Sequence, residues 1–563
     1  MAASKLLLDY VYAHEQALAD QVYLTQPIGN GEVVDFTWQQ LMDQSRRMAT
    51  HLQTRGFEPG ARIAILSKNT AHFIMTELAI WMSGGTTVAI FPTESAETVK
   101  YILQHSGACL LFVGKLDNWA QQMPGVPSGL PCISLPLAPA TSFQTWDSVV
   151  KNSAPMTGEP ARKPDDLAML MYTSGSTGTP KGVMHSFEGA TRASEGIIAY
   201  QDKQAGANFE YRALSYLPLA HIFERAWIEC AGFVRGNGHI FFAESLETFQ
   251  KDLQRARPTA FLSVPRLWLK FQQGVFSKMP AKKLDRLLSI PILGKIVARK
   301  VLTQLGLNKV LLAGSGSAPI PPALIAWYRK LGLNLMEGYA MTEDFAYSHT
   351  TTSTLNAAGH VGVPFEGVQR RISEDGEILI KSPGLLVGYY KRPDLDAETF
   401  TADGFFKTGD LGEEGPNGQL KLTGRKKELF KTAKGKYVAP APIENLINES
   451  SMVELSLVSG VGQQAAYAMV VPAEGLRPRL SGPNAEPTAR AEFIEEMTAV
   501  LKRVNSKVAD YEQLKMIVVA REPWSMDNGF LTPTMKIKRN RIEAAVDPQV
   551  EKWFASQEPV VWQ

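Results

Sequence analysis

Between residues 36 and 115 the chain alternates between stretches with helical periodicity and short β-branched runs, and this rhythm restricts its fold more than any other feature. We expect helices over Gln39–Thr54, Ala71–Met82 and Thr98–His105, and strands over Arg62–Leu66 and Thr87–Phe91. Strands joined by crossover helices form parallel sheets that are covered on both faces. Because the rhythm continues through residue 340, we expect a large α/β core.

The composition is typical of a folded protein that stays in a reducing compartment. Of 563 residues, 45% are hydrophobic and 20% are charged, and the net charge of +2 gives no global field that would attract nucleic acid. The cysteines, Cys109, Cys132 and Cys230, are too scattered for a disulfide framework or a zinc site. Met1–Asp20 resembles neither a signal peptide nor a transit peptide, and no apolar run is long enough to span a membrane. We therefore expect a cytoplasmic protein without a nucleic-acid partner.

The composition and the periodicity of the sequence change along the chain. Pro124–Pro164 is rich in Pro, Ser and Ala and predicts an irregular connection. From about residue 360, short alternating segments such as Gly376–Lys381 and Gln419–Leu422 predict a β-rich subdomain. We therefore expect an α/β fold with two domains. Residues 1–423 form a large N-terminal domain of layered sheets and helices that includes the β-rich subdomain, and residues 424–563 form a small, mobile α+β C-terminal domain.

The most informative segment is Tyr172–Val183, which follows the apolar stretch Leu167–Met171. Its glycines let the backbone approach an anion, its hydroxyl groups donate to phosphate oxygens, and Lys181 adds a positive charge. The Walker pattern is excluded because Pro180 precedes Lys181 and Gly182 follows it. The segment favours a polyphosphate-binding loop, and a surface loop of small residues is the alternative.

This segment resembles the phosphate-binding loop of the adenylate-forming, or acyl-activating, enzyme superfamily. That superfamily includes acyl-CoA synthetases, aryl-CoA ligases, luciferases and nonribosomal-peptide adenylation domains. Further segments match in the order and at the spacings of the family, within about residues 30 to 545: Leu217–Arg225, Gly338–Glu343, Lys407–Asp410, Gly424–Glu428 and Lys536.

Three segments are most similar to the long-chain fatty acyl-CoA synthetase branch: Leu217–Arg225, Phe430–Pro440 and Leu531–Arg539. The chain departs from that branch at Ala340, where the branch usually has glycine. Because alanine adds only one methyl group close to the nucleotide, the resemblance holds.

The resemblance implies a ligase that works in two steps on medium- to long-chain fatty acids. A carboxylate is a poor acylating agent, so ATP first converts it into an acyl adenylate with release of pyrophosphate, and coenzyme A then accepts the acyl group with release of AMP. Three alternatives stay open: a fatty acyl-AMP ligase that loads a carrier protein, a β-lactone synthetase on the same fold, and a degenerate nucleotide-binding regulatory protein. No Ser-His-Asp order or metal-spaced His pair favours a hydrolase.

The resemblance also implies which residues hold ATP. Asp410 would accept both ribose hydroxyls, with Arg425 as the matching donor across the strand; an ordinary hairpin-turn aspartate is the alternative. Tyr339 would lie against the adenine face, and a wall of small residues would line the other side: Gly316, Ser317 and Ala318. The phosphate-binding set is Thr173, Ser174, Gly175, Ser176, Thr177, Gly178, Thr179 and Lys181.

Four residues are expected to carry the chemistry. Thr342 would contact the α-phosphate, and Glu343 would hold Mg²⁺ with help from Thr177, because magnesium is usually held by one carboxylate with phosphate oxygens and waters. His221 would lie beside the reacting carboxylate, although a lone histidine is also a common core residue. Lys536 would bridge the carboxylate and the α-phosphate; the alternative is a solvated basic strand.

Lys427 matches the hinge of the family. A rotation there would remove Lys536 after the first step and present the loop Lys434–Lys436 for the second. Gly435 in this loop would leave room for the pantetheine arm of coenzyme A.

Residues 266–309 are strongly basic, with ten Lys or Arg and the single acid Asp285. Interleaved leucines and isoleucines make this segment a candidate for peripheral contact with the inner face of a membrane, where fatty acids gather. A solvated helix face that packs its leucines inward is the alternative. Homodimerisation is a further hypothesis.

We expect Lys536→Ala to slow adenylate formation by several orders of magnitude while leaving thioester formation from supplied acyl adenylate largely intact. The reason is that the ammonium offsets charge repulsion only in the first step. Pyrophosphate release and acyl-CoA formation, measured separately, test this assignment, and an equal loss in both steps would refute it.

Overall fold

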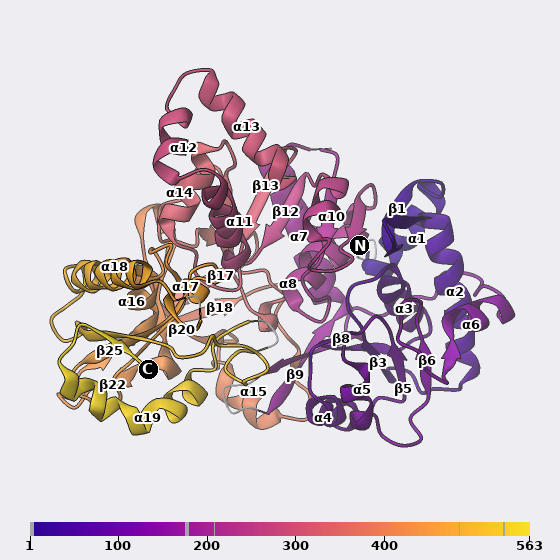
Figure 1. Ribbon diagram of the computed structural model, residues 1–563. Coiled ribbons are helices and arrows are strands. Elements are labelled where there is room, and N and C mark those ends of the chain that lie inside the picture. Colours follow the sequence, from indigo (N-terminus) through magenta and orange to yellow (C-terminus); the bar gives the residue numbers. More distant parts are fainter. Residues whose placement is uncertain (1–4, 175–178, 208, 484, 533–534) are drawn as a thin grey trace.

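The computed structural model describes residues 5–174, 179–207, 209–483, 485–532 and 535–563 (Figure 1). Its largest sheet has eight strands, in the spatial order β19-β9-β8-β4-β3-β5-β6-β7. From β7 to β8 neighbouring strands run parallel, whereas β9 and β19 are antiparallel to their neighbours. The strands are β3 (Arg62–Leu66), β4 (Thr86–Ile90), β5 (Leu110–Val113), β6 (Cys132–Ser134), β7 (Gln144–Thr145), β8 (Leu167–Ser174), β9 (Pro180–Ser186) and β19 (Gly388–Tyr389). The expected α/β core with parallel strands is confirmed.

A second sheet packs nearby, with the helix α3 (Ala71–Met82) between the two sheets. Every residue of α3 is buried, because it contacts β3 and β4 on one side and β1 on the other. A helix enclosed in this way is expected to be apolar on most sides, and the polar residues of α3, His72, Thr76 and Glu77, are buried with the rest. The second sheet has the order β10 (Arg212–Ser215), β11 (His239–Phe242), β1 (Val22–Gly29) and β2 (Glu32–Thr37).

The remaining helices of this half lie around the two sheets. They are α1 (Leu7–Ala17), α2 (Trp38–Thr54), α4 (Ala96–Ser106), α5 (Trp119–Gln122), η1 (Met123–Gly125), α6 (Trp146–Asn152), α7 (Phe187–Ala205), α9 (Ala231–Arg235) and α10 (Phe249–Ala256). Four of them, α2, α4, α6 and α7, begin with a side-chain cap: the hydroxyls of Thr37, Ser95, Thr145 and Ser186 accept from backbone N–H groups three residues ahead. The cysteines Cys109, Cys132 and Cys230 are all free thiols.

A third sheet supplies the strand ends that face the candidate site. Its order is β12 (Ala260–Ser263), β13 (Leu312–Ser315), β14 (Leu335–Tyr339), β15 (His349–Thr350) and β16 (Val363–Pro364). Four helices accompany it: α11 (Pro265–Lys278), α12 (Ala281–Leu288), α13 (Leu293–Leu305) and α14 (Pro322–Lys330). The parallel strands β12, β13 and β14 end side by side, so the turns after them gather at one edge of the sheet.

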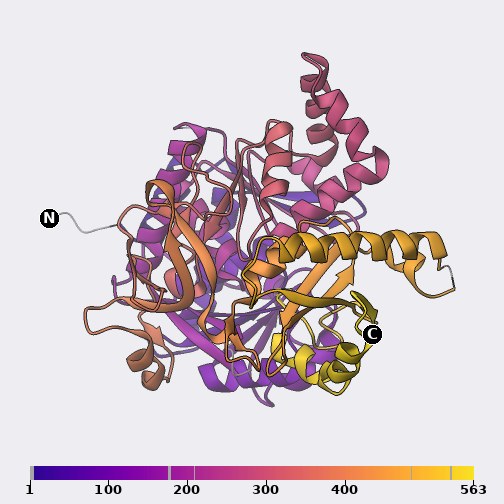
Figure 2. The same ribbon diagram turned by 90° about the vertical axis from the view of Figure 1, so that its left-hand side faces the viewer.

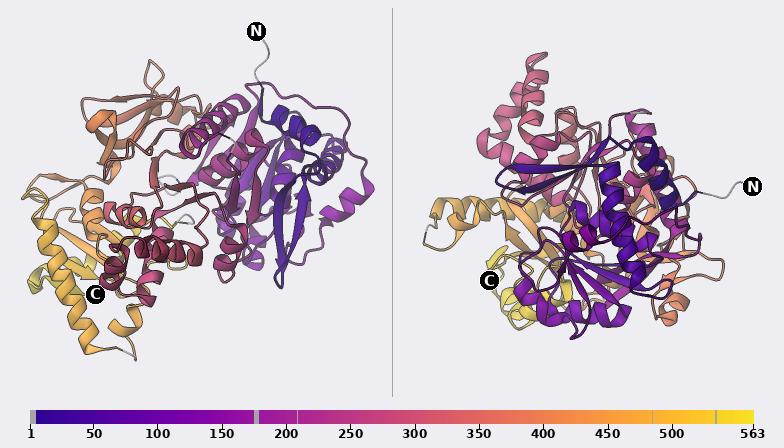
Figure 3. Two further views of the ribbon diagram at one scale, coloured as in Figure 1. Left: turned by 90° about the horizontal axis from the view of Figure 1, so that it is seen from above. Right: turned by 90° about the vertical axis from the view of Figure 1, so that its right-hand side faces the viewer.

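The expected β-rich subdomain is an antiparallel sheet of β17 (Gln369–Ile372), β18 (Glu377–Lys381), β20 (Phe406–Glu414) and β21 (Leu420–Arg425). Short helical turns connect or precede its strands: α15 (Pro393–Thr399) and η4 (Pro416–Gly418). After β21 the chain passes through η5 (Lys426–Glu428) into the C-terminal part. Seen from above, this sheet and the C-terminal part lie at the same end of the molecule, opposite the N-terminal helices (Figure 3).

The C-terminal part has its own sheet and core. The sheet order is β24 (Val453–Ser459), β25 (Ala466–Pro472), β26 (Leu514–Val519) and β27 (Val560–Trp562), and a small hairpin joins β22 (Phe430–Lys431) to β23 (Tyr437–Val438). Its helices are α16 (Pro440–Ile447), α17 (Arg477–Leu480), α18 (Pro487–Asn505) and α19 (Arg539–Ser556). Among the described residues, no helix is long and apolar enough to cross a membrane.

The expectation of an irregular connection over Pro124–Pro164 was wrong in part. This segment contains β6, β7 and α6, and Trp146 of α6 is fully buried. The two strands have three residues and two residues. Strands this short show no periodicity, and they form because β5 offers an unpaired parallel edge.

A buried charge cluster anchors the segment that precedes the candidate site. Arg225 is completely buried and forms ion pairs with Glu77 of α3 and with Glu229, whose carboxylate lies 3.1 Å away. Arg225 also donates from Nε to the Leu219 carbonyl at 2.9 Å and from its backbone N–H to the His221 carbonyl at 3.1 Å. The cluster therefore ties the turn that contains His221 to α3, the helix buried between the two sheets.

We expect Arg225→Met to destabilise the fold by about 3 to 5 kcal/mol near neutral pH, because two buried carboxylates lose their counter-charge. Burial already holds the pKa of Glu229 well above its usual range. Because the Arg225 charge lowers the pKa of Glu229, its loss raises that pKa further, and a carboxyl whose folded pKa is raised loses stability as pH rises above its unfolded value; the deficit should therefore grow above about pH 5. Denaturant unfolding at several pH values measures this.

The matched control is Arg479→Met, because the ion pair of Arg479 with Glu486 is solvent-exposed. We expect it to change stability by less than about 1 kcal/mol. Equal effects of the two substitutions would contradict the role given to the buried cluster.

Candidate active site

The expected phosphate loop joins β8 to β9. These strands pair in antiparallel register, with Thr173 opposite Lys181 and Ser174 opposite Pro180. Thr173 and Lys181 are half-buried, and Thr179 is exposed. The tip of the loop, with Gly175, Ser176, Thr177 and Gly178, lies outside the described residues. The loop therefore starts and ends on two paired strands of the largest sheet.

Tyr389 connects this hairpin to the expected magnesium ligand. It lies on β19, which pairs with β9. Its hydroxyl donates to Oε1 of Glu343 at 2.9 Å, and Nζ of Lys181 lies 5.0 Å from its ring centroid. Burial and the Glu343 carboxylate raise the pKa of Tyr389, so the tyrosine remains a donor at neutral pH. The Tyr389 side chain thus contacts both Lys181 of the loop and the Glu343 carboxylate.

Glu343 lies in the helical turn η3 (Thr342–Asp344), which begins three residues after the end of β14. Asp344 secures this turn, because it accepts from the backbone N–H groups of Met341 at 3.0 Å and Tyr347 at 3.3 Å. Burial raises the pKa of Asp344 to about 8. Thr342 and Glu343 are half-buried at the surface of the turn.

The donor set fits magnesium held largely by a nucleotide. Glu343 offers a carboxylate, and no group of three or more His, Cys, Asp or Glu side chains suited to a metal occurs among the described residues. A metal at this position would take most of its ligands from phosphate oxygens and water, which is how Mg²⁺ is commonly bound.

Asp410 lies on β20 and is 8% exposed. Its Oδ2 accepts from the Tyr339 hydroxyl at 2.8 Å, and its Oδ1 accepts from Nε of Arg425 at 2.7 Å. Asp410 and Arg425 are direct partners in the β20–β21 register. Each carboxylate oxygen keeps a lone pair for one more donor, so the pair can still receive a vicinal diol.

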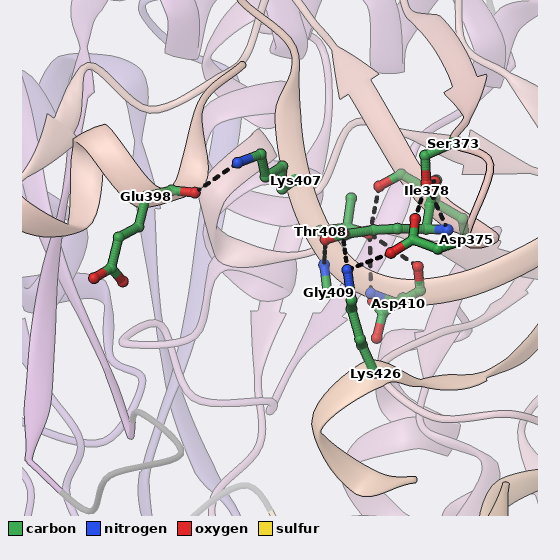
Figure 4. A network of polar contacts seen from close by, with 10 residues as sticks. Ser373, Asp375, Ile378, Glu398, Lys407, Thr408, Gly409, Asp410 and Lys426 are labelled. Atoms are coloured by element: carbon green, nitrogen blue, oxygen red, sulfur yellow. Dashed lines mark hydrogen bonds and ion pairs between the residues drawn. The ribbon is translucent and has the colours of Figure 1, made fainter. Parts of the chain in front are cut away.

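The turn before Asp410 is held by a polar network that reaches Lys426 (Figure 4). The Thr408 hydroxyl donates to the Ile378 carbonyl at 2.8 Å and accepts from the Asp410 backbone N–H at 3.1 Å. Lys426 binds Asp375 at 2.6 Å and Glu377 at 3.0 Å. Because Glu377 also accepts from the backbone N–H of Gly409 at 3.0 Å, the open end of the β20–β21 pair is tied to β18.

The small residues Gly316, Ser317 and Ala318 form the turn after β13. Gly316 is buried, and a Cβ atom there would lie 3.5 Å from the ring of Phe223. Ser317 has a φ of 70°, which side chains rarely adopt, and Ala318 is exposed. The turn therefore lies next to the helix that follows His221.

His221 caps the short helix α8 (Ile222–Glu224), with its Nδ1 accepting from the Phe223 backbone N–H at 3.2 Å. Burial, and the nearby ammonium of Lys536, lower the pKa of His221 to about 3. The ring is therefore neutral at physiological pH. Because Nδ1 accepts, the proton resides on Nε2, which is then a hydrogen-bond donor.

Lys536 belongs to a tight turn of the C-terminal part, in which the Thr532 hydroxyl accepts from the Lys536 backbone N–H at 3.0 Å. Its side chain is solvent-accessible, yet surrounding protein desolvates it and lowers its pKa. The guanidinium of Arg425 lowers this pKa further, whereas Asp410 and Glu343 oppose the shift. The charges that act on Lys536 thus belong to residues that precede it by more than a hundred positions.

The expected hinge adjoins this cluster, and the second loop belongs to the C-terminal part. Lys427 is exposed in η5, two residues after the Arg425 that contacts Asp410. The loop with Gly435 is exposed, and Gly435 has a φ of 76°. The loop is hydrogen-bonded within the C-terminal part, for example from the Ala433 backbone N–H to the Gln463 carbonyl at 2.8 Å. In this arrangement the charges of Arg425, Asp410 and Glu343 act on the ammonium of Lys536.

A salt-bridge cluster docks the C-terminal part onto α11. Arg266 of α11 and Arg477 both form ion pairs with Glu454, which is 11% exposed. Lys270 pairs with Glu474 at 3.2 Å, and both of these side chains are largely exposed. Glu454 therefore separates two guanidinium groups, one from each side of the interface.

Sequence reasoning missed several residues that build the site. Tyr389 and Glu454 carry no local motif, because their roles depend on strand pairing and on domain contact. Asn69 holds the segment before His221: its side chain accepts from the Leu219 backbone N–H at 2.8 Å and donates to the Leu217 carbonyl at 2.6 Å. A polar residue that follows a buried strand was the one signal that could have identified Asn69.

Comparisons with known proteins identify the family of the chain. Residues 13–390 match the family model described as AMP-binding enzyme, and residues 428–558 match the AMP-binding enzyme C-terminal domain. Together these matches include Lys181, Glu343 and Lys536.

The chain is 30% identical to "Long-chain-fatty-acid--CoA ligase FadD15" of Mycobacterium bovis, with 96% of each chain covered. It is 29% identical to "Long-chain-fatty-acid--CoA ligase 1" of Homo sapiens, with coverage of 92% of this chain and 81% of the human protein. In fold it is similar to the A domain of a carboxylic acid reductase from Segniliparus rugosus, with a TM-score of 0.80, 22% identity and coverage of 98% and 94%. The anthranilate CoA ligase AuaEII gives a TM-score of 0.78 at 18% identity, with coverage of 97% and 98%.

We expect Glu454→Gln to lower the rate of adenylate formation about tenfold relative to thioester formation, because Arg266 and Arg477 then repel each other across the interface. Adding Arg266→Gln should restore much of the ratio by removing the repulsion. The two half-reactions, measured separately on the same preparations, report this ratio.

The matched control is Lys270→Gln, which breaks an exposed pair and should change the ratio less than about twofold. If Glu454→Gln slowed both half-reactions equally, the ion pairs would have no part in selecting the orientation of the C-terminal part.

Proposed function

Because this chain belongs to the AMP-binding enzyme family, we propose that it is an ATP-dependent ligase that joins a medium- or long-chain fatty acid to coenzyme A. The observation that supports this most is the geometry of the nucleotide site, in which Tyr339 and Arg425 hold the Asp410 carboxylate and Tyr389 holds Glu343. The names of full-length relatives add the substrate class, since they are long-chain fatty-acid–CoA ligases.

In the first step, the fatty acid carboxylate attacks the α-phosphorus of ATP and pyrophosphate leaves. Asp410, held by Tyr339 and Arg425, would accept the ribose hydroxyls and fix the nucleotide. The β8–β9 loop would bind the outer phosphates, with Lys181 close to Tyr389. Mg²⁺ on Glu343 would supply neutralising charge on the phosphates. Positioning and charge neutralisation are the main demands of phosphoryl chemistry.

Lys536 and His221 would offset the negative charge of the carboxylate and the α-phosphate as these groups react. A carboxylate and an α-phosphate repel each other as they meet, and the Lys536 ammonium would bridge their oxygens. Desolvation strengthens this attraction because the local dielectric is low. His221, neutral and protonated on Nε2, would donate a hydrogen bond to the carboxylate without adding a second positive charge beside Lys536. Thr342 would contact the α-phosphate.

In the second step, the thiol of coenzyme A attacks the adenylate carbonyl and AMP leaves. We propose that the C-terminal domain, residues 424–563, rotates about Lys427 between the steps, so that the Gly435 loop replaces Lys536 at the site. The exposure of that loop and its positive φ suit the close passage of a pantetheine arm.

We also propose that the enzyme collects its fatty acid at a membrane surface through the basic segment 266–309. Free long-chain acids partition into lipid, so an enzyme that docks there meets a higher substrate concentration. Homodimerisation remains a prediction.

A chain-length series of fatty acids tests the proposed function. We expect ATP-dependent release of pyrophosphate and AMP with acids of medium to long chain, and acyl-CoA when coenzyme A is present. Mass spectrometry of the products separates the alternatives: acyl transfer only to a phosphopantetheinyl carrier protein indicates an acyl-AMP ligase, and lactone formation from a β-hydroxy acid indicates a β-lactone synthetase. Cleavage of ATP to ADP, or no turnover with any acid, would overturn the proposal.

A further inference from the structure

The helices α12 and α13 form a hairpin that projects from the body of the protein. In two views at right angles, the turn between them is the point of this region farthest from the sheets (Figures 1 and 2). The inner faces of the helices pack on the core through Leu284, Ala298, Leu302 and Leu305. The hairpin is therefore an ordered part of the fold whose outer end has no neighbour among the described residues.

The outer end of this hairpin exposes aliphatic side chains. Ile292 is 76% exposed and Ile296 is 60% exposed, and Ile290 and Leu293 beside them are exposed as well. Single exposed aliphatic residues are common on protein surfaces, but a group of four at the apex of a projection indicates an interaction site. We call Ile290, Ile292, Leu293 and Ile296 the apex residues.

The backbone at the apex holds a rarely populated conformation. Ile292 has a φ of 67° and a ψ of −58°, and the Leu293 N–H donates to the Pro291 carbonyl at 2.8 Å. This is a γ-turn with positive φ, which is strained for any residue and most of all for a β-branched one. Gly294 permits the tight connection, since a Cβ atom there would lie 2.3 Å from the Leu288 carbonyl oxygen. The packing of α12 against α13 thus outweighs the preference of Ile292 for negative φ, and the Ile292 side chain stays exposed to solvent.

Basic side chains surround the apex on both helices. Six are exposed: Lys282, Lys283, Arg286, Lys295, Arg299 and Lys300. None of the six has a carboxylate within 4.0 Å among the described residues. The acid of the hairpin, Asp285, is already paired with Lys330 at 3.1 Å.

A shallow groove of about 600 Å³ on α13 is lined by Ile296, Arg299, Lys300, Thr303 and Gln304. The groove combines two cations with an apex residue.

We propose that the α12–α13 hairpin docks on a bilayer that contains anionic phospholipid. The apex residues enter the boundary between head groups and acyl chains, and the six cations lie at the level of the phosphates. This order, with apolar groups at the tip and cations behind them, matches the order of layers in a membrane. A protein partner is disfavoured because the apolar group is small and is ringed by charges of one sign.

The hairpin is also connected to the candidate site. It follows α11 after two residues, and α11 begins directly after β12, whose end contacts the Gly316 turn. In the basic segment 266–309, Arg266 and Lys270 are engaged by the C-terminal part, which leaves the hairpin cations free for lipid. The physiological sense of the docking rests on the proposed function, because a fatty acid ligase gains substrate at a membrane.

Flotation of the purified full-length protein with vesicles tests the docking. One set of vesicles is phosphatidylcholine and the other is phosphatidylcholine with phosphatidylglycerol. We expect binding to the anionic vesicles, weakened by salt, and little binding to the neutral ones. The double variants Ile292→Ser/Ile296→Ser and Arg299→Glu/Lys300→Glu should each weaken binding by about tenfold or more, because each removes one of the two contributions.

Matched controls change similar side chains elsewhere. Leu246→Ser removes an aliphatic group that is 90% exposed, and Lys515→Glu/Lys552→Glu reverses two exposed charges in the C-terminal part. Both should bind vesicles like the unchanged protein, and the hairpin variants should keep its melting temperature and its activity on a soluble short-chain acid.

The proposal fails if the unchanged protein ignores anionic vesicles, if it binds neutral vesicles equally well, or if hairpin and control variants bind alike. Because flotation needs no turnover, a protein that binds vesicles but forms no acyl-CoA would disprove the proposed function and leave the docking intact. A protein that forms acyl-CoA but does not float with anionic vesicles would disprove the docking and leave the proposed function intact.

Discussion

The pairing of β20 with β21 is the constraint on which the candidate site depends. It places Arg425 opposite Asp410, so that the guanidinium and the Tyr339 hydroxyl together hold one carboxylate in a fixed direction. The same strand end leads directly into Lys426 and Lys427. A carboxylate suited to a ribose diol and the segment about which the C-terminal part is proposed to turn are therefore set by a single strand register. A slip of either strand by one residue would turn its side chain to the opposite face of the sheet and separate the pair.

Around this pair, the protein gathers charges that would repel one another if they were not balanced. Lys536 lies near Arg425 but also near Asp410 and Glu343, and the guanidiniums of Arg266 and Arg477 are separated by Glu454. Deep in the core, Arg225 is matched by Glu77 and Glu229. Buried and partly buried charges of this kind fix geometry more than they add stability, because desolvation offsets much of their attraction. Fixed geometry is what a reaction dominated by positioning requires.

The helix α11 relates three regions that are far apart in the sequence. Its beginning adjoins the turns of the third sheet, its charged face binds the C-terminal part, and its end leads into the α12–α13 hairpin. The surface proposed to meet lipid, the interface that orients Lys536 and the edge that lines the candidate site are thus parts of one continuous segment. Substrate collection and domain orientation therefore share a single structural support in this proposal.

Local patterns in the sequence determined the helices Ala71–Met82 and Trp38–Thr54, the strand Arg62–Leu66, the α/β class and the family, because periodicity and short motifs are written in consecutive residues. The motifs also gave the candidates Glu343, Asp410 and Lys536 one by one. They gave no distances between them, and they missed Tyr389, Asn69 and Glu454. Only the tertiary structure decided that β19 joins β9, that Glu454 meets α11 and that Ile292 is held outward, since these depend on strand pairing and helix packing between residues that no local pattern connects.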